Sequence, residues 1–483
     1  MFSRLKNWWN QPCGAKELLI IALPLIISTS SWSIMHFIDR LYLAWYSKEA
    51  LAACMPAGMT HFTIFCFPQG VAAYCVTFVA QYWGAKRPER IASVVWQGLY
   101  IGFLFLPIIW LTGLAAPWFY NFLGHSADVA AHEAMYYRSL CVCGGACIMS
   151  AALTGFFSGR GQTWIVMIVD TLASGLNIAL DLVMIFGTSK ISWWFLPQIP
   201  ELGIVGAGLA TSIAVWFKTI VYFAIFWSKR NRTAFNTLTN WKYDWSVMRR
   251  LLYFGAPSGL QLIVENFAMT SQLLIMGVIG SVEIAGTNLA FNIECLVFMP
   301  VLGLGLALTA MVGQCQGKQR PDLSVKATHT ALWFGLSYTA IFVALYIFCP
   351  RFFFIAHEWG AGEDFAQTEA MAVYLLQFIA VFMVFDSLNV LFSSVLRGAG
   401  DTAYVLLISI CVCPLPAILS YVGVYLLGQG ITYAWIVMSA GIFTLCTCFY
   451  IRYRLGYWKS MQVIEPEAIS LNDDSVILRQ NIG

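Results

Sequence analysis

The sequence predicts an all-α integral membrane protein with twelve transmembrane helices in two bundles of six. Three observations lead to this fold class: the composition, the number of long apolar runs and an internal repeat. Of the 483 residues, 59% are hydrophobic and only 11% are charged, and the mean hydropathy is +0.72. Soluble domains carry about 25% charged residues. The net charge of +3 also argues against a nucleic-acid binder with a basic patch and against an acidic disordered chain.

The apolar runs define the expected helices. A bilayer core about 30 Å thick requires about 20 apolar residues per helix. Runs of this kind occur in chain order at 17–46, 52–81, 92–114, 134–157, 163–187, 203–228, 250–279, 284–315, 326–349, 370–396, 402–427 and 431–451. The first run is too long for a cleaved signal peptide and lacks a clear cleavage site, so we expect it to be retained as a helix.

The two halves of the chain share a scaffold of glycine, proline and glutamine residues. A shift of 233 positions aligns Pro24 with Pro257, Gly70 with Gly303, Gln81 with Gln314 and Gly84 with Gly317. Because six helices precede the second copy, both copies enter the membrane from the same side, which makes the repeat parallel and leaves a central cleft. We expect an N-lobe at 1–229, a linker at 230–249, a C-lobe at 250–458 and a polar tail at 459–483.

The positions of the basic residues predict the orientation. With both termini and every second loop on one side, 21 of the 27 Lys and Arg residues lie on that side. Basic residues favour the cytoplasmic side. We therefore expect a multi-pass protein of the cell (inner) membrane with both termini in the cytoplasm. The six exceptions are Arg40, Lys48, Arg138, Lys190, Lys218 and Arg351.

Six acidic residues fall inside the expected helices: Asp39, Asp170, Asp181, Glu265, Glu294 and Asp386. An acid at the centre of a membrane helix costs about 2.5–3.5 kcal/mol on insertion scales, so such residues are candidates for function. Only Lys218 is a basic residue well inside a run. Carboxyl groups in such places can exchange protons, or bind Na⁺ together with amide oxygens.

The acids fall into two groups along the chain. In the first half, Asp170, Asn177 and Asp181 are spaced i, i+7 and i+11 and therefore share one helical face. In the second half, Gln261 precedes Glu265 by one turn, and Asn389 follows Asp386 by one turn. The amides Asn288 and Asn292, also one turn apart, are expected to line the same cleft.

Several motifs in one order resemble the multidrug and toxic compound extrusion (MATE) transporters over about residues 15–455. Pro24 and Asp39 lie in the first helix, and the Gln81–Gly84 segment is echoed by Gln314–Gly317. Further marks are Asn177, Asp181, Glu265, Asp386 and the segment 397–402. The resemblance implies antiport of organic, often cationic, compounds in exchange for H⁺ or Na⁺.

The resemblance also implies roles for individual residues. Asp39, Asn177, Asp181 and Thr211 match a cation site in the N-lobe, where Asp39, Asn177 and Asp181 are candidate ligands for Na⁺. Glu265 and Asp386 match C-lobe acids that bind the coupling ion or the cargo, and the other expected cargo contacts are Gln261, Asn288, Asn292 and Glu294. Pro24 would bend its helix in response to protonation of Asp39. The alternative for the N-lobe group is a polar network that only fixes helix packing.

Other functions fit the sequence less well. There is no GxxxxGK[ST] loop, since Gly317-Lys318 is followed by Gln319, so we expect an ion gradient rather than ATP to drive transport. A lipid-linked oligosaccharide flippase of the same superfamily is the alternative, but it would be expected to have a strongly basic cleft. A membrane enzyme would need clustered acid–base residues. We expect a monomeric transporter, not an enzyme, whose partners are small organic substrates and the bilayer, with no nucleic acid and no cofactor beyond H⁺ or Na⁺.

Overall fold

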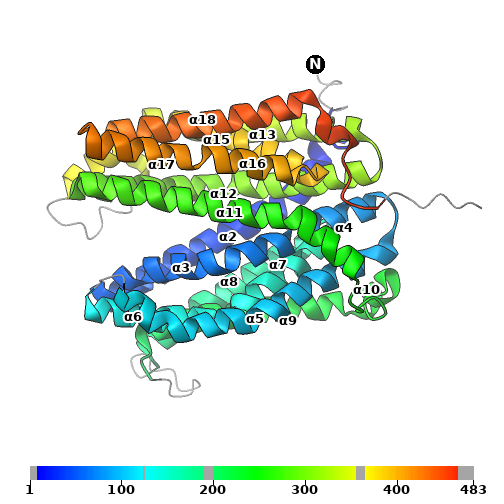
Figure 1. Ribbon diagram of the computed structural model, residues 1–483, viewed down its shortest axis with the longest axis horizontal. Coiled ribbons are helices and arrows are strands. Elements are labelled where there is room, and N and C mark those ends of the chain that lie inside the picture. The colour runs from blue at the N-terminus through cyan, green and yellow to red at the C-terminus, as the bar shows by residue number, and fades with distance from the viewer. Residues whose placement is uncertain (1–7, 123–125, 189–199, 355–364, 466–483) are drawn as a thin grey trace, which may run out of the picture.

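The computed structural model describes residues 8–122, 126–188, 200–354 and 365–465, and these residues contain helices but no strands. The helices form two lobes side by side (Figure 1). The N-lobe helices are α2 (Ala15–Tyr46), α3 (Lys48–Ala73), α4 (Cys75–Gly84), α5 (Ile91–Phe122), α6 (Ala127–Cys141), α7 (Gly144–Ser158), α8 (Thr163–Phe186) and α9 (Gly203–Phe226). The C-lobe helices are α11 (Trp245–Ile279), α12 (Ser281–Gly317), α13 (Pro321–Phe348), α15 (Phe365–Ala399), α16 (Thr402–Val412), α17 (Pro414–Tyr421) and α18 (Ile431–Leu455).

The expected twelve spans are confirmed, and one of them consists of two helices joined at a bend. Eleven helices among the described residues are long and apolar enough to cross a membrane, and the pair α6–α7, bent by 43°, makes a twelfth span. The short helix α10 (Lys229–Phe235) lies at the start of the predicted linker, and α11 begins within that linker at Trp245. Its N-cap is Asp244, whose side chain accepts hydrogen bonds from the Ser246 and Val247 amides.

Repeat-related residues pack against each other across the lobe boundary. A Cβ on Gly84 would lie 2.1 Å from the Gln314 carbonyl oxygen, and a Cβ on Gly317 would lie 2.0 Å from the Gln81 carbonyl oxygen. These reciprocal contacts, between residues that the 233-position shift aligns, are the signature of a two-fold axis between the lobes. We call the end of the molecule formed by Gly84, Gly159 and Gly317 the basic end; it is the right-hand end of Figure 1.

Hydrogen bonds close the lobes together at the basic end. The Gln81 amide donates to the Gly398 carbonyl (3.1 Å), and the repeat-related Gln314 amide donates to the Gly159 carbonyl (2.9 Å). Farther from this end, interlobe hydrogen bonds join Thr29 to Met299 and Asn266 to Thr63. Toward the opposite end the ribbons of the lobes diverge (Figure 1). The lobes are therefore held together by hydrogen bonds at the basic end and lie farther apart toward the opposite end.

A short C-terminal segment, residues 461–465, also crosses the basic end; we call it the strap. It follows the 3₁₀ turn Tyr457–Ser460 (η4). On the N-lobe side, the Val463 amide donates to Gln81 Oε1 (2.8 Å). On the C-lobe side, Arg250 donates to the Val463 carbonyl and the Gln462 amide donates to the Gln316 carbonyl. The tail expected from residue 459 therefore starts as a segment docked on both lobes.

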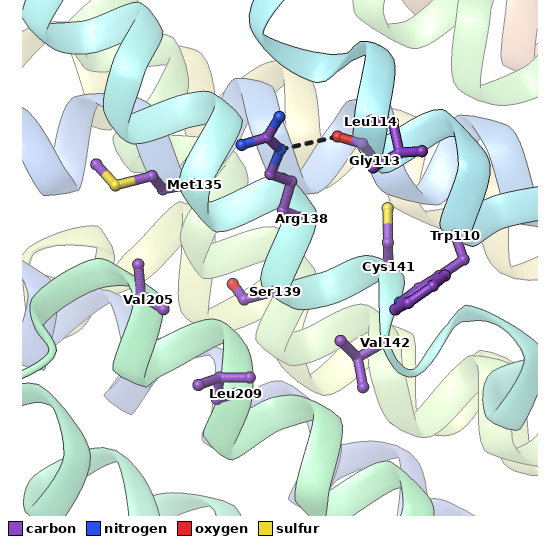
Figure 2. Close-up of a pocket in the computed structure, with 10 residues that line it drawn as sticks. All are labelled: Trp110, Gly113, Leu114, Met135, Arg138, Ser139, Cys141, Val142, Val205 and Leu209. Carbon is purple, nitrogen blue, oxygen red and sulfur yellow. Dashed lines mark hydrogen bonds between the residues drawn. The ribbon is translucent and has the colours of Figure 1, made fainter.

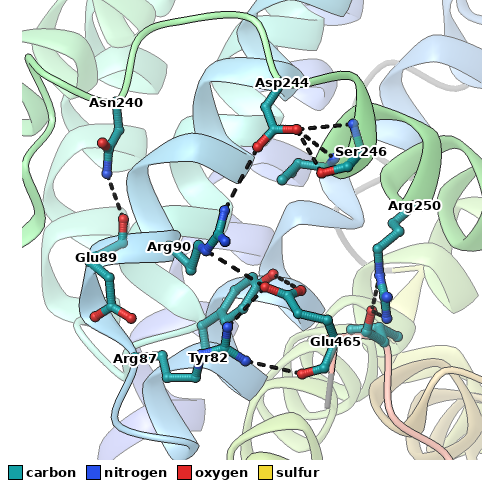
Figure 3. A network of polar contacts seen from close by, with 11 residues as sticks. Tyr82, Arg87, Glu89, Arg90, Asn240, Asp244, Ser246, Arg250 and Glu465 are labelled. Atoms are coloured by element: carbon teal, nitrogen blue, oxygen red, sulfur yellow. Dashed lines mark hydrogen bonds and ion pairs between the residues drawn. The ribbon is translucent and has the colours of Figure 1, made fainter. Parts of the chain in front are cut away.

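Glu465 anchors the strap to the N-lobe (Figure 3). Its carboxylate accepts from the Tyr82 hydroxyl (2.6 Å) and from Arg87 (3.0 Å), and it lies 3.6 Å from Arg90. Partial burial acts to raise the pKa of Glu465, but the Tyr82 hydrogen bond and the two arginines outweigh it and hold the pKa below its ordinary value. Arg90 also faces Asp244 at the start of α11 (3.7 Å), so this cluster ties α4, α11 and the strap together.

Candidate functional site

Three N-lobe helices bring the first predicted group of residues together. Asp39 lies on α2, Asn177 and Asp181 lie on α8, and Thr211 lies on α9. Asp39 is 4% exposed, and Asn177 and Asp181 are fully buried. α8 presents Asn177 and Asp181 on one face because they are one turn apart. The helical face on which the sequence predicts Asn177 and Asp181 is therefore the face that packs on α2 and α9.

The Asn177 side chain sits at the centre of this group. With its amide nitrogen facing the acids, it donates to Asp39 Oδ1 (2.9 Å) and to Asp181 Oδ2 (3.2 Å), while its oxygen accepts from the Thr211 amide (3.2 Å). Asp181 Oδ1 is buried and has no hydrogen-bond partner among the described residues. His36 reaches the group from its exposed side, with Nδ1 3.6 Å from Asp39 Oδ2.

This arrangement places two carboxyl groups in a dry interior with one amide between them. Neither acid has a Lys or Arg partner among the described residues, and two like charges at such a site repel strongly. A proton or a small cation between them relieves the repulsion, and the free Asp181 oxygen is a ready acceptor or ligand. The four residues thus form a site with the chemistry to hold one positive charge.

Asp170 belongs to a different network. It accepts from Ser28 of α2 (2.5 Å) and from Tyr222 of α9 (2.8 Å), and Lys218 lies 3.8 Å from the same carboxylate. Asp170 shares a helical face with Asn177 and Asp181 by its spacing in the sequence, but the structure gives it partners of its own. Its partners Ser28 and Tyr222 were not predicted; the one signal was the basic Lys218 inside a span. Ser28 is one turn from Pro24, so this network holds α2 beside its proline.

Two of the three C-lobe acids have a local amide partner. Gln261 donates to Glu265 (2.6 Å) on α11, and Asn389 donates to Asp386 (3.4 Å) on α15. Asp386 interacts electrostatically with Glu265 and also with Glu294 of α12. Three helices of the C-lobe therefore bring the three acids near one another, and all three are partly exposed.

The predicted amides on α12 have fewer contacts. Asn288 and Asn292 are exposed, and no described side chain hydrogen-bonds to either. Gln272, two turns after Glu265, is buried and donates to Ser420 and to the Ala434 carbonyl. Gln272 therefore ties α11 to α17 and α18, whereas Asn288 and Asn292 remain free to contact another molecule.

Comparison with known proteins places the chain in a family. The model of the MatE family matches residues 24–183 and 257–422, once in each half. The probable multidrug resistance protein NorM of Bradyrhizobium diazoefficiens is 28% identical over 450 residues, covering 91% of this chain and 93% of that protein.

Solved structures agree in fold. A MOP superfamily transporter from Pyrococcus furiosus Vc1 (DSM3638) has a TM-score of 0.82 at 20% identity, covering 94% of this chain and 98% of that one. A multidrug resistance MATE family transporter in an outward-facing conformation has a TM-score of 0.81 at 20% identity, covering 93% and 97%. The double match to the family model coincides with the repeat seen in the sequence and in the packing. The chain belongs to the MatE family and is a multi-pass MATE multidrug efflux transporter, not an enzyme.

Proposed function

We propose that this transporter exports organic cations in exchange for H⁺ or Na⁺ by alternating access of its two lobes. The observation that carries the proposal is the buried pair Asp39 and Asp181, bridged by the Asn177 amide. Two buried carboxyl groups with no basic partner are stable together only when a cation neutralises part of their charge. Such a pair loads and unloads positive charge, which is what an ion-driven exchanger requires.

α2 connects this site to the lobe boundary. It carries Asp39 near one end, and nearer the other end its Thr29 bonds Met299 of the C-lobe and its Ile26 backbone abuts Gly303. Pro24 lies in the same helix and leaves one backbone carbonyl without its usual partner, so α2 can bend there. A change of charge at Asp39 would loosen α2 from α8 and alter its contact with α12. This supports a conformational role for Pro24.

The C-lobe acids favour a cationic cargo. Glu265, Glu294 and Asp386 give the C-lobe a cluster of negative charge in a partly exposed region, which attracts cations. The Gln261 and Asn389 amides hold the carboxylates of Glu265 and Asp386 in place, and the exposed Asn288 and Asn292 offer further polar contacts. The one intramembrane lysine, Lys218, already faces Asp170. This charge distribution argues against the alternative of a flippase for anionic lipid-linked sugars.

The orientation follows from charge. The basic end carries Arg87, Arg90 and Arg250, and by the positive-inside tendency it faces the cytoplasm of the cell (inner) membrane, as do both termini. The bonded lobes at that end and the diverging lobes at the other then correspond to an outward-facing state. One chain holds both lobes and both acid sites, so we propose the monomer as the transporting unit.

The experiment is cargo flux in proteoliposomes under an imposed pH step and, separately, an imposed Na⁺ step. We expect one of the two gradients to drive flux in the unmodified protein, and Asp39→Asn or Glu265→Gln to abolish it while the protein remains folded. Asp322→Asn is the matched control, because Asp322 pairs only with Arg320 at the exposed surface. Flux that neither gradient drives, or full flux in Asp39→Asn, would refute the proposal.

A further inference from the structure

One of the few basic residues away from the basic end borders a groove on the outer side of the N-lobe. The groove has a volume of about 430 Å³ and lies between α5, α6 and α9, at the bend before α7 (Figure 2). Its lining is largely apolar: Trp110, Leu114, Met135, Cys141, Val142 and Leu209. Trp110, Leu114, Met135 and Val142 are 39–68% exposed. We call this the Arg138 groove, after its one charged residue.

Arg138 is only partly satisfied. Its Nε donates to the Gly113 carbonyl of α5 (2.9 Å), which fixes the guanidinium at the rim. Its two terminal nitrogens have no partner among the described residues. The other polar side chain of the lining, Ser139, already donates to the Tyr136 carbonyl (2.7 Å). The groove therefore offers a free, planar pair of N–H donors above an apolar floor.

Arg138 lies close to the boundary between the hydrocarbon core and the headgroups of a bilayer. α5 has 32 residues and is about 48 Å long, so it overhangs a 30 Å hydrocarbon core by about 9 Å at each end if centred. Gly113 is nine residues from the end of α5 at Phe122, or about 13 Å. The guanidinium thus falls about 4 Å below the boundary of the core, within reach of the headgroups for a long side chain.

We infer that the Arg138 groove binds an anionic phospholipid from the half of the bilayer opposite the basic end. The phosphate pairs with the free nitrogens of Arg138, since guanidinium and phosphate match in charge and bidentate geometry. One acyl chain lies along the apolar lining between Val142 and Leu209. Figure 1 places α5, α6 and α9 on the side of the N-lobe remote from the C-lobe, so the groove faces lipid rather than the lobe boundary.

This site is separate from the transport machinery. Arg138 and the groove share no residue with the Asp39–Asn177–Asp181 group or with the C-lobe acids. However, the lipid would bridge α5, α6 and α9 at the bend of the α6–α7 span, where the Trp216 indole also donates to the Val142 carbonyl (3.0 Å). A bound lipid would therefore brace the broken span.

The test is native mass spectrometry of the purified full-length protein titrated with dioleoyl phosphatidylglycerol. Arg138→Gln removes the charge and should weaken binding roughly tenfold, because it loses a charge-assisted, bidentate pair. Val142→Trp fills the groove without touching Arg138 and should weaken binding as well. Arg351→Gln, which removes another cation expected on the same side of the membrane, is the matched control and should bind as the unmodified protein does.

Two further probes test separately whether binding requires the phosphate and the acyl chains of the lipid. Dioleoylglycerol lacks the phosphate, and glycerol phosphate lacks the chains, so neither should displace phosphatidylglycerol. Equal binding by the unmodified protein and Val142→Trp would overturn the inference, even if Arg138→Gln failed to fold. Displacement by either partial probe would overturn it too.

Discussion

At the scale of single residues, two acids of α8, Asp170 and Asp181, differ in the partners that surround their carboxyl groups. Asp170 has three partners that use its charge, Ser28, Tyr222 and Lys218. Asp181, three turns further on, shares one amide with another acid and keeps one oxygen without a partner. The surroundings of Asp170 stabilise a charged carboxylate. The surroundings of Asp181 destabilise one, because a second carboxyl group lies nearby. We therefore propose that Asp170 serves stability and that Asp181 serves transport.

The first prediction follows from that difference. Asp170→Asn leaves the Lys218 ammonium without its counter-ion and should lower the free energy of unfolding by about 1–3 kcal/mol. The double variant Asp170→Asn with Lys218→Met should recover much of that loss, because no unpaired charge remains. Thermal unfolding in detergent measures both.

Asp181→Asn is the matched control for this comparison. It relieves repulsion rather than breaking a pair, so the unfolding temperature should stay the same or rise while transport is lost. The single variants Asp170→Asn and Lys218→Met should each lower the free energy of unfolding by a measurable amount. If the loss in the double variant equalled the sum of these two losses, Asp170 and Lys218 would not act as a pair.

At the scale of elements, the ends of α4 and α12 determine how closely the lobes approach. Gly84 of α4 and Gly317 of α12 each meet the backbone of the other lobe, where a side chain has no room. Gln81 and Gln314 then bond carbonyls at the ends of α15 and α7. These contacts must all break if the basic end is to open during alternating access.

Gly84→Ala should therefore weaken the closed basic end. The new methyl would contact the Gln314 backbone, a clash that costs about 1–3 kcal/mol unless the lobes separate. Cys315, the residue that follows Gln314, is buried, and its Sγ lies 3.4 Å from the Sγ of Cys13. Its rate of reaction with a maleimide should rise in Gly84→Ala, as read by peptide mass spectrometry.

The control for that experiment is Gly58→Ala, because a methyl on Gly58 of α3 meets nothing within 4 Å. Its Cys315 should react at the unmodified rate. Unchanged protection of Cys315 in Gly84→Ala would show that the glycine contact does not hold the basic end closed.

The strap is the second element that joins the lobes, and its anchor depends on pH. The pKa of Glu465 is lowered in the folded protein, so its contribution is complete above the ordinary pKa of glutamate, about 4.3. It is lost as pH falls through the lowered value. The strap can be followed by the distribution of distances between spin labels at Ser460 and Asn240. This distribution should stay narrow between pH 8 and 5 and should broaden at lower pH.

Glu465→Gln should show the broad distribution at every pH, since it removes the charge that Arg87 and Arg90 face. Asp322→Asn, which alters an exposed pair near the same end, should behave as the unmodified protein. A distribution that stays narrow in Glu465→Gln would show that the strap is held without the Glu465 carboxylate, by the bonds of Val463, Gln462 and the Glu465 backbone carbonyl.

At the scale of the whole molecule, the sequence was enough to predict the spans, the repeat and the grouping of the N-lobe polar residues. Long apolar runs, and glycines at matching positions, can be recognised in the sequence without knowledge of contacts between distant segments. The grouping of Asp39 with Asn177 and Asp181 came from helical spacing and family resemblance, and the packing agrees. The Asp170 partners and the docked strap were not predicted, because Ser28, Tyr222 and Glu465 acquire their roles only from contacts between distant segments.

In the proposed mechanism, movement of cargo is tied to movement of a cation at Asp39 and Asp181. The most direct measurement uses proteoliposomes with no imposed gradient, loaded with a pH-sensitive or Na⁺-sensitive dye, to which cargo is added. We expect counter-movement of H⁺ or Na⁺ in a fixed ratio to cargo, and loss of that signal in Asp181→Asn. Cargo that crosses the membrane with no counter-movement of either ion would contradict it.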